Sequence, residues 1–119
     1  MPLGRVNSAG MPTVPIVVAG LELEAAIDTG YEGGLQLPLA WLSVLNPPPR
    51  AKTRYQLPNG QIIEEVTYSV PVRINGDELD ADTYFSPNDD VLIGVEILRG
   101  YRLEINSFTG SVILDRVAP

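Results

Sequence analysis

The sequence predicts a single all-β domain. Its 119 residues are enough for one modest hydrophobic core and too few for two domains. Short apolar runs alternate with the turn signals Asn59-Gly60 and Asn75-Gly76. An Asn-Gly pair between two strand-like runs is a strong indication of a β-hairpin, so these signals place the chain in the all-β class.

The composition excludes several kinds of chemistry. The chain has no cysteine and no histidine, which rules out disulfides, thiolate nucleophiles, Ser-His-Asp arrangements and histidine metal sites. Carboxylates therefore remain as the acid–base groups. The net charge is −7, from 15 acidic and 8 basic side chains, and this balance argues against nucleic acid as a partner. We interpret the acidic charge as a solubility feature.

We expect no targeting segment at the N-terminus. No apolar stretch is long enough to cross a membrane, and the first residues lack an apolar signal core. We therefore expect no membrane partner and a cytoplasmic location. Residues 1–13 mix Gly, Pro, Ser and Asn without periodicity, so we expect a flexible arm or an edge strand there, and the domain itself over 14–119.

The first predicted hairpin ends at a carboxylate. Residues 14–19 and 21–27 are typical of two strands joined at Gly20, and Asp28, Thr29 and Gly30 follow directly. A carboxylate at the buried end of a strand is unfavourable unless it is hydrogen-bonded or used in function. Asp, Thr and Gly are also ordinary turn residues, and the triplet taken alone favours a turn.

A glycine pair and a short helix follow the triplet. Gly33 and Gly34 let the backbone pass close to another group, which is either a substrate or the returning chain in a tight turn. Residues 38–45 are typical of a short helix, since Pro38 is accepted in a first turn and the prolines at 47–49 end it.

The rest of the chain reads as hairpins around one buried strand. Residues 53–57 and 61–63 flank the first Asn-Gly turn, and residues 66–74 and 79–85 flank the second. The run from Val91 to Gly94 is typical of a buried strand that ends at a glycine. Residues 101–105 and 111–114 predict a closing hairpin.

Two of these motifs together resemble a known family. Asp28-Thr29-Gly30, followed by an aromatic residue and a Leu-Pro step, and the later segment Val91–Gly94 are similar to motifs of the retropepsin-like aspartic proteases of clan AA. The single-domain bacterial and archaeal members are the most similar, and the resemblance extends from about residue 14 to 114. It implies a closed β-barrel of the acid-protease fold with a flap hairpin and one short helix. It also implies a homodimer, because one such triplet provides half of a two-aspartate site.

The resemblance implies roles for individual residues. Asp28 would be catalytic, and Thr29 and Gly30 would support the active-site loop and the dimer. The expected substrate-binding positions are Tyr31, Glu32, Gly33, Pro58, Asn59 and Gly60. Ile93 and Gly94 would lie behind the site. Retroviral members pair an arginine after this glycine with an acid beyond the triplet, whereas Val95 and Glu32 occupy these positions here, so that ion pair is absent.

The implied activity is that of an aspartic endopeptidase acting on a peptide or protein substrate. Two facing Asp28 carboxylates would share a proton; one would deprotonate a water that attacks the peptide carbonyl, and the other would hydrogen-bond the oxyanion. No cofactor or metal is required. Two alternatives remain: a non-catalytic module of the same fold that binds extended peptides or mediates dimerisation, and a structural dimer without a ligand. The intact triplet favours the enzyme, because binding alone does not require a like-charged pair.

Overall fold

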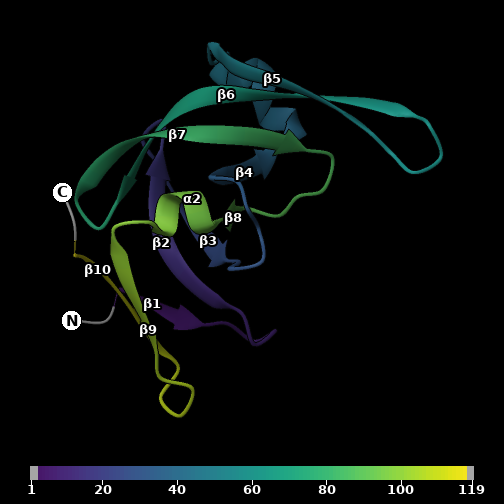
Figure 1. Ribbon diagram of the computed structural model, residues 1–119. Coiled ribbons are helices and arrows are strands. Elements are labelled where there is room, and N and C mark those ends of the chain that lie inside the picture. The colour runs from purple at the N-terminus through teal and green to yellow at the C-terminus, as the bar shows by residue number, and fades with distance from the viewer. Residues whose placement is uncertain (1–2, 118–119) are drawn as a thin grey trace.

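Strands and tight turns make up most of residues 3–117, the part of the chain that the computed structural model describes (Figure 1). The strands are β1 (Gly4–Val6), β2 (Pro12–Val18), β3 (Leu21–Ile27), β4 (Leu35–Pro38), β5 (Pro49–Gln56), β6 (Ile62–Ile74), β7 (Asp77–Ser86), β8 (Leu92–Ile93), β9 (Tyr101–Ile105) and β10 (Ser111–Arg116). The helical segments are η1 (Leu39–Trp41, a 3₁₀ turn), α1 (Leu42–Leu45) and α2 (Val95–Leu98). None of the described helices is long and apolar enough to span a membrane.

The prediction of a mostly-β chain is confirmed, with differences in detail. The described residues contain two single-turn α-helices where the expected fold had one. β6 is a single 13-residue strand that serves both central hairpins, whereas the sequence pattern indicated two separate runs. The turn residues behave as the sequence indicates: Gly60 and Gly76 both have positive φ, of 88° and 82°.

All ten described strands belong to one sheet, in the order β5-β6-β7-β4-β8-β3-β2-β1-β10-β9. A short further pairing joins Val17–Val18 of β2 to Val72–Arg73 of β6, so the sheet curves until these two strands meet. β1 pairs with both β2 and β10. The N-terminal segment thus provides an interior strand rather than an edge strand.

The core lies inside this curved sheet. It is formed by inward-facing aliphatic residues of most of the strands, among which Val14, Ile16, Leu35, Leu37, Ile74, Ile93, Val112 and Leu114 are at most 1% exposed. The buried positions in β2 and β10 alternate with less buried ones, as expected for strands with one face on the core. Residues adjoining the candidate site, such as Ile27 and Ile93, are therefore held by core packing.

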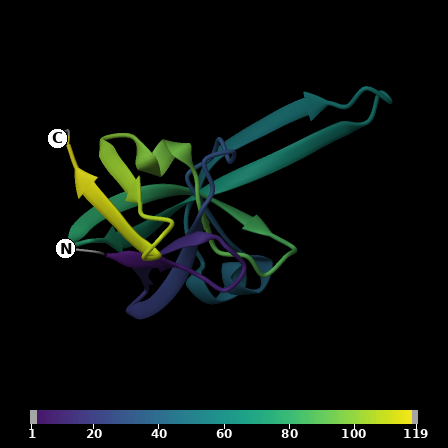
Figure 2. The same cartoon turned by 90° about the horizontal axis from the view of Figure 1, so that it is seen from below.

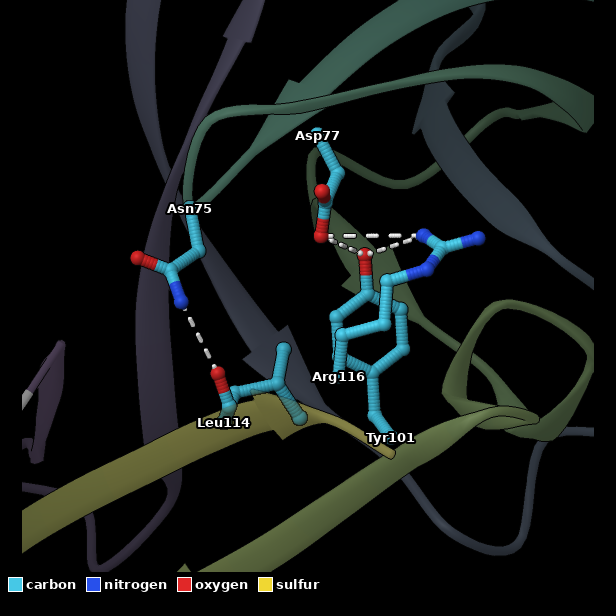
Figure 3. A network of polar contacts seen from close by, with 5 residues as sticks. All are labelled: Asn75, Asp77, Tyr101, Leu114 and Arg116. Atoms are coloured by element: carbon cyan, nitrogen blue, oxygen red, sulfur yellow. Dashed lines mark hydrogen bonds and ion pairs between the residues drawn. The ribbon is translucent and has the colours of Figure 1, made fainter. Parts of the chain in front are cut away.

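A polar cluster ties the turn between β6 and β7 to the C-terminal hairpin (Figure 3). The Tyr101 hydroxyl donates to Asp77 Oδ2 at 2.8 Å, and the Arg116 guanidinium lies 3.3 Å from that hydroxyl and 3.6 Å from Asp77 Oδ2. Asn75 Nδ2 donates to the Leu114 carbonyl at 3.0 Å. Partial burial and the Asp77 carboxylate raise the pKa of Tyr101, so its hydroxyl stays protonated and able to donate.

Candidate active site

Three short strands position the loop that carries Asp28. β8 lies between β3 and β4: it is parallel to β3, with Ile27 opposite Ile93, and antiparallel to β4, with Leu35 opposite the same Ile93. Residues 28–34, here called the aspartate loop, therefore leave the sheet beside β8 and re-enter it on the other side of β8. β8 thus lies between the two strands that the aspartate loop connects.

Gly94 allows the aspartate loop to contact the start of α2. Its N–H donates to the Gly34 carbonyl at 2.7 Å, and the next N–H, of Val95, donates to the Tyr31 carbonyl at 2.9 Å. A Cβ atom on Gly94 would lie 2.6 Å from the Tyr31 carbonyl oxygen and closer still to that of Gly33. Only a glycine leaves room for the loop at this position.

The backbone on both sides of Asp28 is fixed by hydrogen bonds. The Asp28 N–H donates to the Ile93 carbonyl at 2.9 Å, and the Asp28 carbonyl accepts from the Tyr31 N–H at 3.1 Å. The side chain is half-buried, and its Oδ1 accepts from the Gly30 N–H at 2.9 Å. One carboxylate oxygen is thus oriented by the loop itself, while Thr29 and Gly30 lie exposed at the loop surface.

The Tyr31 ring lies against the two glycines that surround it. A Cβ on Gly33 would lie 2.5 Å from the Tyr31 hydroxyl, and a Cβ on Gly94 would lie 2.6 Å from Tyr31 Cδ2. A Cβ on Gly34 would lie 2.6 Å from the Asp82 carbonyl oxygen of β7. The sequence left open whether this glycine pair approaches a substrate or the chain, and in this structure both glycines are packed against the chain.

The electrostatic surroundings of Tyr31 are negative. Burial, together with Glu65, Asp82 and Glu96, raises the pKa of Tyr31 to about 12. The phenol is therefore neutral at physiological pH and provides a hydrogen-bond donor beside the loop.

The β5–β6 hairpin extends away from the rest of the sheet (Figures 1 and 2). Its tip is a turn in which Gly60 N–H donates to the Leu57 carbonyl at 2.9 Å and Asn59 Oδ1 accepts from the Gln61 N–H at 2.9 Å. Both views place this turn away from the loop that connects β3 to β4. Of the expected substrate-binding residues, the structure thus groups those at 31–33 and leaves those at 58–60 apart from them.

The base of the hairpin and the aspartate loop enclose a cavity of about 420 Å³. Its walls are residues 31–34 of the loop, Ala51 and Thr53 of β5, Glu65 and Thr67 of β6, and Asp82 of β7. We call it the loop–hairpin cavity. A second cavity, of about 460 Å³, lies between β1, β2 and β3 and is not lined by any residue of the aspartate loop. Within residues 3–117, no group of three Asp or Glu side chains is arranged to hold a metal ion.

Several residues of the loop–hairpin cavity were not identified from the sequence. Glu65 and Thr67 could have been found, because the Asn59-Gly60 turn fixes a register in which they lie opposite Thr53 and Ala51 on one face of the hairpin. Asp82 is brought beside the aspartate loop by the parallel pairing of β4 with β7, which has no local sequence signal.

No protein-family model matches the chain, and no curated protein matches it. Solved structures do match. A retropepsin-like aspartic protease from Rickettsia conorii superposes with a TM-score of 0.67 at 17% identity, over 97% of this chain and 89% of that chain. The simian foamy virus (mac) protease gives a TM-score of 0.61 at 20% identity, over 72% and 90% of the two chains.

A third structure, a foamy viral protease-reverse transcriptase, gives a TM-score of 0.59 at 22% identity; the match covers 81% of this chain and 13% of that much longer one. At such identities a likeness shows the fold alone. These superpositions show that the chain has a retropepsin-like fold.

Proposed function

We propose that this chain is an aspartic endopeptidase that works as a homodimer. The observation that supports this most directly is the position of Asp28: it follows a core strand, on a loop fixed by hydrogen bonds to β8 and α2, in a fold shared with aspartic proteases. A carboxylate on a loop that hydrogen bonds hold in place is the kind of group that acid–base catalysis uses. The substrate is a peptide or protein, and the reaction requires no cofactor.

One chain carries half of the catalytic site. A second copy brings its own Asp28 to face the first, and the two carboxylates share one proton because like charges at short range do not readily ionise together. The ionised carboxylate removes a proton from a water molecule that attacks the peptide carbonyl. The protonated carboxyl group hydrogen-bonds the oxygen on which negative charge develops.

The neighbouring residues support this dyad. The Gly30 N–H holds Asp28 Oδ1, which leaves Oδ2 for water and for the partner carboxyl group. Thr29 is exposed at the loop surface, where its hydroxyl is available to hydrogen-bond the opposite loop. The β5–β6 hairpin acts as the flap: its tip, residues 58–60, swings toward the aspartate loop over bound peptide and excludes water.

Substitution of Asp28 by Asn tests the proposal. Asn is nearly isosteric and still accepts the Gly30 N–H, but it neither takes a proton from water nor donates an acidic one. We expect turnover of an unstructured protein or peptide to fall by about a hundredfold or more. The melting temperature should be unchanged or higher, because a like-charge repulsion is removed.

The matched control is Asp89→Asn, which changes an exposed aspartate in the loop after β7 and should leave turnover unaltered. Light scattering over a concentration series should give a dimer mass when peptide is bound. Turnover by Asp28→Asn at the wild-type rate, or a monomer at every concentration, would contradict the proposal. Peptide binding without cleavage by the wild type would identify a binding module instead.

A further inference from the structure

We infer that the loop–hairpin cavity is a subsite that receives a lysine or arginine side chain of the substrate. This inference rests on the proposed function, since the occupant is a side chain of the peptide held between the aspartate loop and the β5–β6 hairpin. Under this inference the enzyme prefers substrates with a basic residue at one position. Asp82, Glu65 and Glu32 determine that preference.

The position of the cavity is that of a side-chain subsite. One wall is the part of the aspartate loop that begins three residues after Asp28, and the opposite wall is the base of the hairpin. A peptide held in an extended conformation projects alternate side chains to opposite sides. A peptide that passes Asp28 beneath the hairpin therefore directs some of its side chains into this space.

The charges on the cavity wall are all of one sign. Glu32, Glu65 and Asp82 line the cavity, and its described lining includes no basic side chain. The basic residues of the hairpin base lie on the other face, because Lys52 and Arg54 alternate with the cavity-lining residues of β5 and form ion pairs with Glu64. Strand alternation thus separates acid from base across the hairpin and leaves the cavity negative.

Two oxygens at this cavity lack hydrogen-bond partners. Asp82 Oδ1 and Thr67 Oγ1 are buried and have no partner among the described residues, although both residues belong to the cavity wall. Asp82 also borders a neighbouring cavity that contains Arg99 and Arg116, but its Oδ1 is bonded to neither. A buried, incompletely paired carboxylate is unfavourable unless a ligand supplies the donor. An ammonium or guanidinium group supplies both the donor and the opposite charge.

The surroundings of the neighbouring residue Tyr31 are consistent with a negative potential in the cavity. Burial is the largest cause of the raised pKa of Tyr31, and Glu65 and Asp82 add to it. Tyr31 also lines the cavity. A negative potential that resists ionisation of a phenol also favours a bound cation at the same place. At about 420 Å³, the cavity has room for a long basic side chain.

The test uses peptides that differ at one position only, which carries lysine, its neutral analogue norleucine, or glutamate. For each peptide, kcat/KM is measured and the cleaved bond is located by mass spectrometry. The wild type should prefer lysine to norleucine by about tenfold to a hundredfold at one position. Asp82→Asn and Glu32→Gln should each lower this ratio several-fold, and Glu32→Lys should shift preference toward the glutamate peptide.

The ratio is taken within one protein, so a change in overall activity does not affect it. The control, Glu104→Gln on β9, removes an exposed carboxylate outside the cavity and should keep the wild-type ratio. Glu32 is itself exposed on the loop, so its variants remain informative if Asp82→Asn does not fold. An unchanged ratio in both Glu32 variants, or a wild type indifferent to lysine at every position, would overturn the subsite.

Binding separates this inference from the proposed function. Affinities of the lysine and norleucine peptides for Asp28→Asn protein, measured by fluorescence anisotropy, should show the same preference without any cleavage. If the wild type cleaves nothing but this preference is present, the proposed function fails and the subsite stands. If peptides are cleaved and bound without the preference, the subsite fails and the proposed function stands.

Discussion

Replacement of Gly94 by alanine should destabilise the protein strongly, because the aspartate loop is packed against this residue. The new Cβ would lie 2.6 Å from both the Tyr31 carbonyl oxygen and Tyr31 Cδ2, and nearer to the Gly33 carbonyl oxygen. Two of these three atoms belong to the backbone, so no side-chain rotation relieves the overlap. The φ of Gly94 is −100°, a value that alanine adopts without strain, so the whole effect is due to the contact.

The loss of stability has two sources, steric overlap and weakened hydrogen bonds of the aspartate loop. Overpacking of a filled site costs about 1–3 kcal/mol. Moving the loop away also weakens the hydrogen bonds from the N–H groups of Gly94, Val95 and Glu96 to loop carbonyls, each worth about 1 kcal/mol. The expected loss is about 3–5 kcal/mol, a large part of the about 5–15 kcal/mol that stabilises a typical domain. The melting temperature should fall by about 10 °C or more.

Thermal unfolding followed by circular dichroism measures this loss, at one protein concentration so that dimerisation does not alter the comparison. Gly110→Ala is the matched control: its Cβ meets nothing within 4 Å, but its φ of +80° makes alanine unfavourable by about 1–2 kcal/mol. Gly94→Ala should therefore unfold at a clearly lower temperature than Gly110→Ala. An equal or higher melting temperature for Gly94→Ala would show that the loop does not contact residue 94 as described.

Two further predictions concern tyrosines. In a spectrophotometric titration, the difference in absorbance between wild type and Tyr31→Phe should have its midpoint near pH 12. A midpoint near pH 10, in protein that circular dichroism shows to be folded, would contradict the burial of Tyr31 and its negative surroundings. Because this pKa is raised on folding, Tyr31 leaves stability unchanged below pH 10 and lowers it as the pH rises from 10 to 12. Tyr101→Phe should lower the free energy of unfolding by about 1 kcal/mol, measured in urea, because the hydrogen bond to Asp77 is lost. The control Tyr68→Phe keeps the edge-on packing against Phe85 and should lower the free energy of unfolding by less. Equal decreases in the two variants would show that the Tyr101 hydroxyl has no stabilising role.

Local signals in the sequence were enough to predict several of the turns and strands. Asn59-Gly60 and Asn75-Gly76 form the expected turns, and Asp28 directly follows the strand that ends at Ile27. The strand expected before Gly94 is present as β8. These features depend on neighbouring residues alone, through backbone angles and apolar periodicity, so a sequence pattern records them.

Long-range pairing could not be predicted in the same way. β8 is only two residues long, and nothing near Leu92–Ile93 indicates that it separates β3 from β4. The charge of the loop–hairpin cavity likewise depends on Asp82, which the pairing of Gln36 with Tyr84 brings beside Gly34. Such contacts join residues 48 to 66 positions apart, and their free energy depends on packing of the whole sheet rather than on local propensity.

The interior position of β1 has a consequence for biosynthesis. Gly4 of β1 pairs with Val112 of β10. Strand β1 therefore has both of its neighbours, β2 and β10, only after almost the whole described chain has been made. During synthesis, β1 and the strand beside it present an open edge until β10 leaves the ribosome, and contacts of such sequence separation form slowly. Gly4 also packs so closely on the Thr13 carbonyl that a side chain would overlap it. The pairing of β1 therefore does not accommodate a larger residue at position 4. The final step of folding is thus expected to be the closing of the sheet around its own N-terminal strand, and chains released before residue 111 would keep that edge open to other chains.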